Sequence, residues 1–250
     1  MILVLAGTQD GRKITDILAQ AGLAVMVSVV SDYGRQLAET GKVAVNACPL
    51  TLDGLVELIR HQGISLVLDA SHPYAVNVSQ NAMSACAVTG IKYLRYERPA
   101  VPFPAYQHLH VVSSYPAAAQ AAAGLGRVVF LTTGSRQLKI FKDEPGLREH
   151  RLIARVLPEP DILSECIHIG FTPRDIVALQ GPFSHELNIA LFKAYDAKVI
   201  VTKNSGKIGG SDTKFTAAME LNLPLVVIDR PAVSYSAVVS SVDEILKHVK

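Results

Sequence analysis

The sequence has few of the residues that build disulfide frameworks or membrane spans. Its 250 residues include no tryptophan, 6% aromatic residues and three cysteines, Cys48, Cys86 and Cys166. The cysteines are far apart, so we expect buried small hydrophobes in a reducing compartment. No apolar run approaches the roughly 20 residues that span a bilayer. The N-terminal MILVLAGTQDG lacks the basic region of a signal peptide. These absences predict a soluble, cytoplasmic protein without membrane contact.

Charge and the common catalytic motifs are also sparse. Charged residues make up 18% of the chain and the formal net charge is +2, which does not favour nucleic acid as a partner. The sequence contains no H-E-x-x-H, no G-x-S-x-G and no paired cysteines. A metal ligand set and acyl transfer therefore have no support from motifs. If the protein binds anions, local clusters of basic residues must provide the attraction, because the net charge is small.

What the chain does have is an alternation of apolar strands and helical patterns. This rhythm predicts βαβ units, and right-handed crossovers place the turns after the strands at one edge of each sheet. Three prolines fall within residues 99–104 and favour an extended connection. We predict an α/β protein of two Rossmann-like or flavodoxin-like parallel-sheet domains facing a central cleft. The predicted parts are an N-terminal domain at 1–97, a linker at 98–106 and a C-terminal domain at 107–250.

The turn after the first strand, residues 7–11, loosely resembles a dinucleotide fingerprint. Gly7 and Gly11 let the backbone approach a phosphate, and the following helix offers unpaired N–H groups. Asp32 lies 25 residues beyond Gly7 and could hold a ribose hydroxyl, whereas Arg35 could meet a 2′-phosphate. The choice between NADH and NADPH stays open, and so does an ordinary βα turn.

Residues 66–75, LVLDASHPYA, combine a buried strand with polar groups at its end. Open α/β sheets bind ligands at this end of a strand. His72 and Tyr74 add an imidazole and a phenol at this strand end, a place suited to chemistry. In the simpler interpretation, Asp69 and Ser71 cap the next helix and Pro73 opens it.

Two later turns carry hydroxyls and cations. Residues 202–214, TKNSGKIGGSDTK, contain three glycines and three lysines after a strand, which predicts a mobile anion-binding loop or a solvated one. Residues 132–136 add hydroxyls and one guanidinium. Arg95 and Arg98, near the predicted linker, would face the cleft or lie on the surface.

The motifs AGTQDGR, SHPYA, LTTGS, ALQGPFS and TKNSG…GG…K, in this order over essentially the whole chain, resemble precorrin-6A reductases of the corrin pathway to cobalamin. Members commonly begin with a GGT-like turn followed by Glu-Ala. With Ala6 to Gly11 there instead, the chain looks more like the branch acting on cobalt-containing intermediates. The resemblance implies reduction of one ring double bond of precorrin-6A, or of its cobalt form, by NADPH or NADH.

With this resemblance the site residues divide into three groups. The predicted catalytic residues are His72, which titrates near neutrality, and Tyr74, as a general acid or for holding a water. The predicted cofactor-binding residues are Gly7, Thr8, Asp32, Ser71, Gly134 and Ser135, and the predicted substrate-binding residues are Arg136, Lys203, Ser205, Gly206, Lys207 and Lys214.

Two other function classes stay open. One is a non-catalytic two-lobed protein that binds an anion or tetrapyrrole. The other is a different NAD(P)-dependent reductase or epimerase on the same fold, although Val78 stands where a Tyr-x-x-x-Lys pair starting at Tyr74 would need lysine. The partners expected are the tetrapyrrole and possible pathway enzymes.

Overall fold

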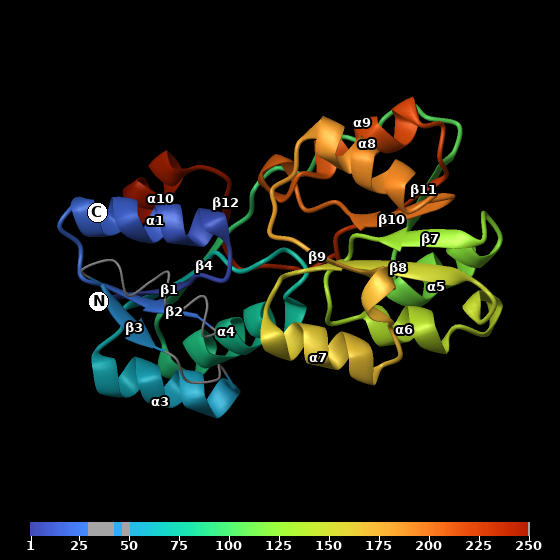
Figure 1. Ribbon diagram of the computed structural model, residues 1–250. Helices are drawn as coiled ribbons and strands as arrows, with labels where there is room; N and C mark the ends of the chain where they lie inside the picture. Colours follow the sequence, from blue (N-terminus) through green and yellow to red (C-terminus); the bar gives the residue numbers. More distant parts are fainter. Residues whose placement is uncertain (30–42, 47–50, 250) are drawn as a thin grey trace. The chain divides into compact units, whose positions relative to one another are not determined.

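The structure is a computed structural model that describes residues 1–29, 43–46 and 51–249 (Figure 1). It divides into two compact units, Met1–Pro99 with Pro231–Lys250, and Ala100–Arg230. The predicted cofactor residue Asp32, together with Arg35 and Cys48, lies outside the described residues.

The first unit is built on a six-stranded parallel sheet. Strand β1 (Ile2–Leu5) lies between β2 and β4, and its Leu5 stands opposite both Ser28 and Asp69. The strand order β12-β5-β4-β1-β2-β3 reverses direction between β1 and β4, as in the Rossmann arrangement. The remaining strands are β2 (Val25–Ser28), β3 (Ala44–Asn46), β4 (Leu66–Asp69), β5 (Lys92–Tyr96) and β12 (Val238–Val239).

Helices cover both faces of this sheet, which explains why its central strands are apolar throughout. Figure 1 shows α1 (Gln9–Gln20) and α10 (Val242–Val249) on one face, and α3 (Leu52–Gln62) and α4 (Val76–Thr89) on the other. Two hydrophobic clusters result, one from each face. The first includes Ile14, Leu18 and Ile245, and the second includes Leu55, Ile59 and Ala85.

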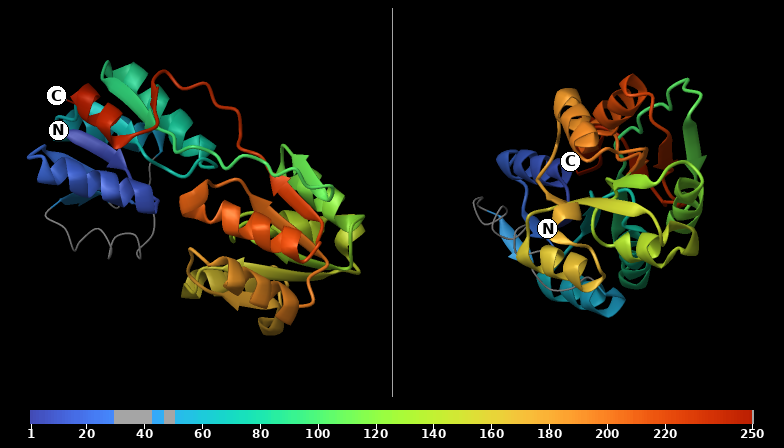
Figure 2. Two further views of the ribbon diagram at one scale, coloured as in Figure 1. Left: turned by 90° about the horizontal axis from the view of Figure 1, so that it is seen from above. Right: turned by 45° about the vertical axis from the view of Figure 1, so that its right-hand side comes forward.

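The position of the C-terminal segment shows that the predicted bounds of the second domain are wrong. Residues 107–250 do not form one domain, because Pro231–Lys250 returns to the first unit. There β12 pairs with β5, with Val238 opposite Arg95, and Ile245 of α10 enters the core. Figure 2 allows the chain to be followed as it passes between the units, first after β5 and again before β12. The first passage, between Pro99 and Ala100, falls inside the predicted linker.

The second unit contains another parallel six-stranded sheet, in the order β6-β11-β10-β7-β8-β9. Figure 1 shows α8 (His185–Ala194) and α9 (Ser211–Glu220) on one face, and α5 (Tyr115–Ala123), α6 (Leu138–Asp143) and α7 (Pro160–His168) on the other. The strands are β6 (Leu109–Val112), β7 (Val128–Leu131), β8 (Arg151–Val156), β9 (Ile176–Ala178), β10 (Val199–Lys203) and β11 (Leu225–Ile228). The prediction of two parallel α/β sheets is confirmed.

Two further findings concern membranes and cysteines. None of the helices in the described part of the chain combines the length and apolarity needed to cross a membrane. Cys86 and Cys166 are free and buried, as predicted for small core residues. Burial, reinforced by the charge of Asp69, raises the pKa of the Cys86 thiol to about 11, so this thiol stays protonated near neutral pH.

Candidate functional site

The turn between β1 and α1 lies where the strand order of the first unit reverses. Thr8 caps α1 by accepting a hydrogen bond from the Gly11 N–H at 3.1 Å, and its own hydroxyl donates to Ala70 O at 3.1 Å. This second bond ties the turn after β1 to the turn after β4. The two predicted segments therefore meet at the switch point, the usual ligand position in such sheets.

Gly7 and Gly11 suit this turn for different physical reasons. A Cβ on Gly11 would stand 2.8 Å from the Cα of Ala6, so α1 packs too closely on β1 for any side chain. Gly7 is exposed and has open space around it, which leaves its backbone accessible to an anion at the N-terminus of α1. Thr8 contributes to the helix cap and is buried.

Arg98 is held within the first unit rather than lying free at a domain junction. Its guanidinium forms an ion pair with Asp10 in the first turn of α1, and both side chains are buried. The predicted surface position of Arg98 is therefore wrong. No local pattern in the sequence predicts this pair, because the two residues are 88 positions apart.

A buried polar network organises the end of β4. Asp69 is fully buried, and it does not cap α4, because the N-cap residue is Ala75 and the helix start has no side-chain cap. The capping interpretation of Asp69 and Ser71 is therefore wrong. The Asp69 carboxylate accepts hydrogen bonds from Ser71 N at 3.0 Å, Ser79 Oγ at 2.6 Å, Tyr93 OH at 2.8 Å and Arg95 Nη1 at 2.9 Å.

The charges of this network are fixed. Burial alone would raise the pKa of Asp69, but the Arg95 guanidinium and the hydroxyl donors outweigh it and hold that pKa below its usual value. Burial opposes the charge of Arg95 as well, yet Asp69 and Glu97 raise its pKa. Arg95 Nε donates to Glu97 at 2.8 Å, so this buried arginine is paired on two sides. Asp69 stays ionised and serves to position its neighbours.

The network holds the turn that carries His72 and Tyr74. Arg95 Nη1 donates to Ser71 Oγ at 3.1 Å, which fixes Ser71 at the start of the turn. Tyr74 N donates to His72 Nδ1 at 3.3 Å, and the two rings lie 5.6 Å apart. With Nδ1 accepting, the neutral imidazole carries its proton on Nε2. Both side chains are partly exposed.

In the second unit the two predicted turns follow neighbouring strands. Residues 132–136 follow β7 and residues 204–210 follow β10, and these strands pair in parallel. Gly134 adopts a φ of 81°, which favours glycine, and Ser135 is partly exposed. Burial and the nearby charge of Arg136 lower the pKa of Lys203 to about 8. The two basic residues follow paired strands, and Arg136 is exposed.

The loop after β10 is more compact than the mobile loop predicted. Ser205 N donates to Ser211 Oγ at 2.8 Å, and Ser211 Oγ donates to Lys203 O at 3.1 Å. A Cβ on Gly209 would lie 2.4 Å from the Cβ of Ser205. Ser205, Gly206 and Lys214 are buried, whereas Lys207 is exposed. The predicted substrate residues thus differ greatly in accessibility.

One basic residue of this region was missed at the level of sequence. Arg155 lies near the end of β8 and is buried, with its Nη1 donating to Asn188 Oδ1 at 2.8 Å. In the sequence, Arg155 could have been noticed as a charged residue inside the apolar run at 152–156. Buried cations at this position are uncommon without a charged partner.

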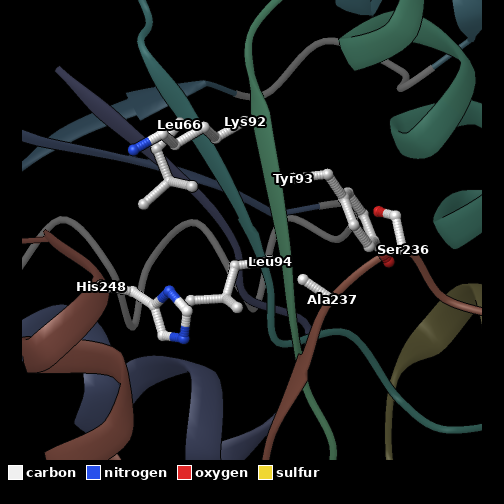
Figure 3. A pocket seen from close by; sticks show the side chains of 7 residues that line it. All are labelled: Leu66, Lys92, Tyr93, Leu94, Ser236, Ala237 and His248. Atoms are coloured by element: carbon white, nitrogen blue, oxygen red, sulfur yellow. The ribbon is translucent and has the colours of Figure 1, made fainter.

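The first unit also has a small hollow at the opposite ends of its strands (Figure 3). Its volume is about 270 Å³. Leu66 and Lys92, which line it, are the first residues of β4 and β5, and Figure 3 shows His248 of α10 beside Leu94. The turns with His72 and Gly7 follow the carboxyl ends of the strands, so this hollow is separate from the candidate site.

A Rossmann-order sheet with a glycine turn at its switch point defines an α/β protein of the dinucleotide-binding class. Comparison with known families then gives the particular group. The family model described as precorrin-6x reductase CbiJ/CobK matches residues 1–250, and the chain belongs to this family of oxidoreductases.

Individual relatives agree with this assignment. The chain is 40% identical over 247 residues to the cobalt-precorrin-6A reductase of Priestia megaterium, covering 98% of this chain and 96% of the relative. It is 36% identical to the cobalt-precorrin-6A reductase of Salmonella typhimurium, covering 92% and 87%. A solved structure titled CobK precorrin-6A reductase superimposes with a TM-score of 0.83 at 28% identity, covering 99% and 95%.

Proposed function

We propose that this protein reduces one ring double bond of cobalt-precorrin-6A to the 6B form, with NADPH or NADH as the hydride source. The observation that carries the proposal is the junction at the β1/β4 switch point. There Thr8 joins the glycine turn of a dinucleotide-type sheet to the turn that holds His72 and Tyr74. The cobalt form is favoured over metal-free precorrin-6A because the relatives at 40% and 36% identity carry the cobalt name.

The first unit fits a nicotinamide dinucleotide. The close contact at Gly11 and the open backbone at Gly7 leave room for phosphates at the N-terminus of α1. Gly7, Thr8 and Ser71 would hold the cofactor on this side, and we retain Gly134 and Ser135 as further cofactor residues. When bound, the cofactor supplies the hydride.

His72 and Tyr74 would provide the proton that the conjugated ring needs as it accepts a hydride. His72 presents Nε2–H because its Nδ1 accepts the Tyr74 amide. The Asp69–Arg95 network keeps the turn in place without giving up a proton, since both charges are stabilised. For the substrate carboxylates we propose Arg136, Lys203, Ser205, Gly206, Lys207 and Lys214.

Turnover of cobalt-precorrin-6A under anaerobic conditions tests this proposal. We expect wild-type protein to oxidise reduced nicotinamide in proportion to substrate, and His72→Ala to lower kcat by about 10²–10⁴-fold, the usual range for a lost general acid. His61→Ala, an exposed histidine on α3, is the matched control and should keep full activity. An unchanged kcat in His72→Ala would remove His72 from the mechanism.

Binding of the two nucleotides can be measured separately from turnover. A ligand at about 100 times its Kd adds about 2.7 kcal/mol to stability if it binds only the folded state. Thermal unfolding with NADPH or with NADH would therefore show which one is preferred. A tetrapyrrole that stabilises the protein while neither nucleotide does, and without turnover, would instead support the non-catalytic binding protein.

A further inference from the structure

We propose that Arg155 and Lys214 form a buried oxyanion site in the second unit, which takes one carboxylate or phosphate group. The existence of this site does not depend on the reaction. That its occupant is a carboxylate arm of the tetrapyrrole rests on the proposed function.

The two cations come from different elements that are joined by one amide. Arg155 is near the carboxyl end of β8, and Lys214 is in the first turns of α9. Asn188 of α8 is fully buried, accepts from Arg155 at 2.8 Å and donates to Thr213 Oγ1, next to Lys214, at 3.4 Å. A buried amide therefore links the end of β8 that carries Arg155 to the turn of α9 that carries Lys214.

Within the described residues, neither cation forms an ion pair with a carboxylate. Arg155 is 6% exposed and Lys214 is 7% exposed. Their hydrogen-bond acceptors are neutral: Asn188 Oδ1 for Arg155, and Gly209 O at 3.0 Å for Lys214 Nζ. Burying a charge without an opposite one is unfavourable, because nothing compensates for the lost hydration. An anionic ligand supplies the missing charge.

Arg155 also keeps donors for such a ligand. The Phe183 ring lies 4.1 Å from its guanidinium carbon and covers one face. Among its nitrogens, only Nη1 bonds to a described residue. The rest of the planar fork is shaped for two oxygens of one carboxylate or phosphate.

Electrostatics at Lys214 couple this site to pH. Burial lowers the pKa of Lys214 to about 7, and the charges of Arg155 on β8 and Lys203 on β10 act in the same direction, against Asp212 on α9. On α8, His185 is bonded to Thr216 and Glu220, and Lys207 in η3 (Lys207–Gly209) is exposed. An anion would raise this pKa, so binding should take up a proton near neutral pH.

Titration calorimetry on the full chain tests the site with two probes. One is uroporphyrin, a stable tetrapyrrole with carboxylate arms, and the other is NADP⁺ compared with NAD⁺. At pH 6.5 we expect Arg155→Met and Lys214→Met each to weaken uroporphyrin binding at least tenfold and leave NADP⁺ binding unchanged. Lys193→Met, an exposed lysine on α8, is the control and should match wild type.

The outcomes separate the sources of the anion. Weaker binding of NADP⁺ but not of uroporphyrin would keep the oxyanion site and assign it to a nucleotide phosphate. Wild-type affinity should also fall above pH 7 by up to about tenfold per pH unit, a dependence that Lys214→Met lacks. Arg155→Lys, which keeps the charge but loses the fork, provides a second test if Arg155→Met fails to fold. Unchanged affinity for both probes in folded variants would overturn the proposal.

The binding measurements on the oxyanion site are independent of turnover. Binding of uroporphyrin through Arg155 and Lys214 in a protein that does not reduce cobalt-precorrin-6A would remove the reductase function and leave the anion site. Turnover with unaffected variants would do the reverse.

Discussion

Two buried arginines, each in a strand next to a sheet edge, have opposite surroundings. Arg95 in β5 and Arg155 in β8 are each one residue before the end of their strand, and each lies near an aromatic ring. Arg95 is paired with Asp69 and Glu97, whereas Arg155 has a neutral amide. The difference indicates that the first site is complete within the protein and positions a turn, and that the second needs an anion from outside.

Removing each arginine provides the largest contrast. Arg95→Met leaves the Asp69 carboxylate buried without its cation, and we expect a loss of about 3–5 kcal/mol in unfolding free energy. Arg155→Met removes a buried charge that has no ionic partner among the described residues and so relieves its desolvation cost. This relief offsets the lost hydrogen bond to Asn188, worth about 1 kcal/mol, and we expect no net loss of unfolding free energy. Urea unfolding of both variants without ligand measures the two values. Equal losses would contradict the comparison.

The close contact at Gly11 predicts the next largest effect. Gly11→Ala places a Cβ against the backbone of Ala6, and overpacking of this kind costs about 1–3 kcal/mol. Gly7→Ala is the matched control for stability, because nothing lies within 4 Å of its new Cβ. We expect thermal unfolding to show a loss for Gly11→Ala alone. A stable Gly11→Ala protein would mean that α1 can move away from β1.

The sequence predicted the sheet edge of the first unit but not all the contacts that form there. The apolar runs of β1 and β4 and the polar residues after them predicted the sheet edge where the site lies. The return of β12 could not be predicted, because two valines and a short amphipathic helix fit either sheet equally well. Likewise, Asp69 and Arg95 are 26 residues apart, and only the pairing of β4 with β5 brings them opposite each other.

Stability against pH tests the charge of Lys214. Its folded pKa of about 7 lies below the value of about 10.4 in an unfolded chain, so the unfolded state binds more protons between these pH values. Stability without ligand should therefore rise with pH across this window, by at most about 1.4 kcal/mol per unit. Lys214→Met should lose this contribution in urea unfolding. A constant difference between the two proteins from pH 7 to 10 would argue against it.

The smallest expected effect concerns the hydroxyl that supports Asp69. Tyr93→Phe removes one of four donors to the carboxylate, and we expect a loss of about 1 kcal/mol, as for a single hydrogen bond. Asp69 should remain ionised, because Arg95 is still in place. Urea unfolding at neutral pH measures this change, and a loss as large as that of Arg95→Met would show that the ion pair is not the main support.

The reductase function is tested most directly by following the hydride. Cobalt-precorrin-6A should be incubated anaerobically with the protein and with nicotinamide nucleotide that carries deuterium at the transferred position, and the product analysed by mass spectrometry. We predict a 6B-type product with one deuterium from the nucleotide, formed far more slowly by His72→Ala. A product without deuterium, or no product from a protein that binds both ligands, would contradict the proposal.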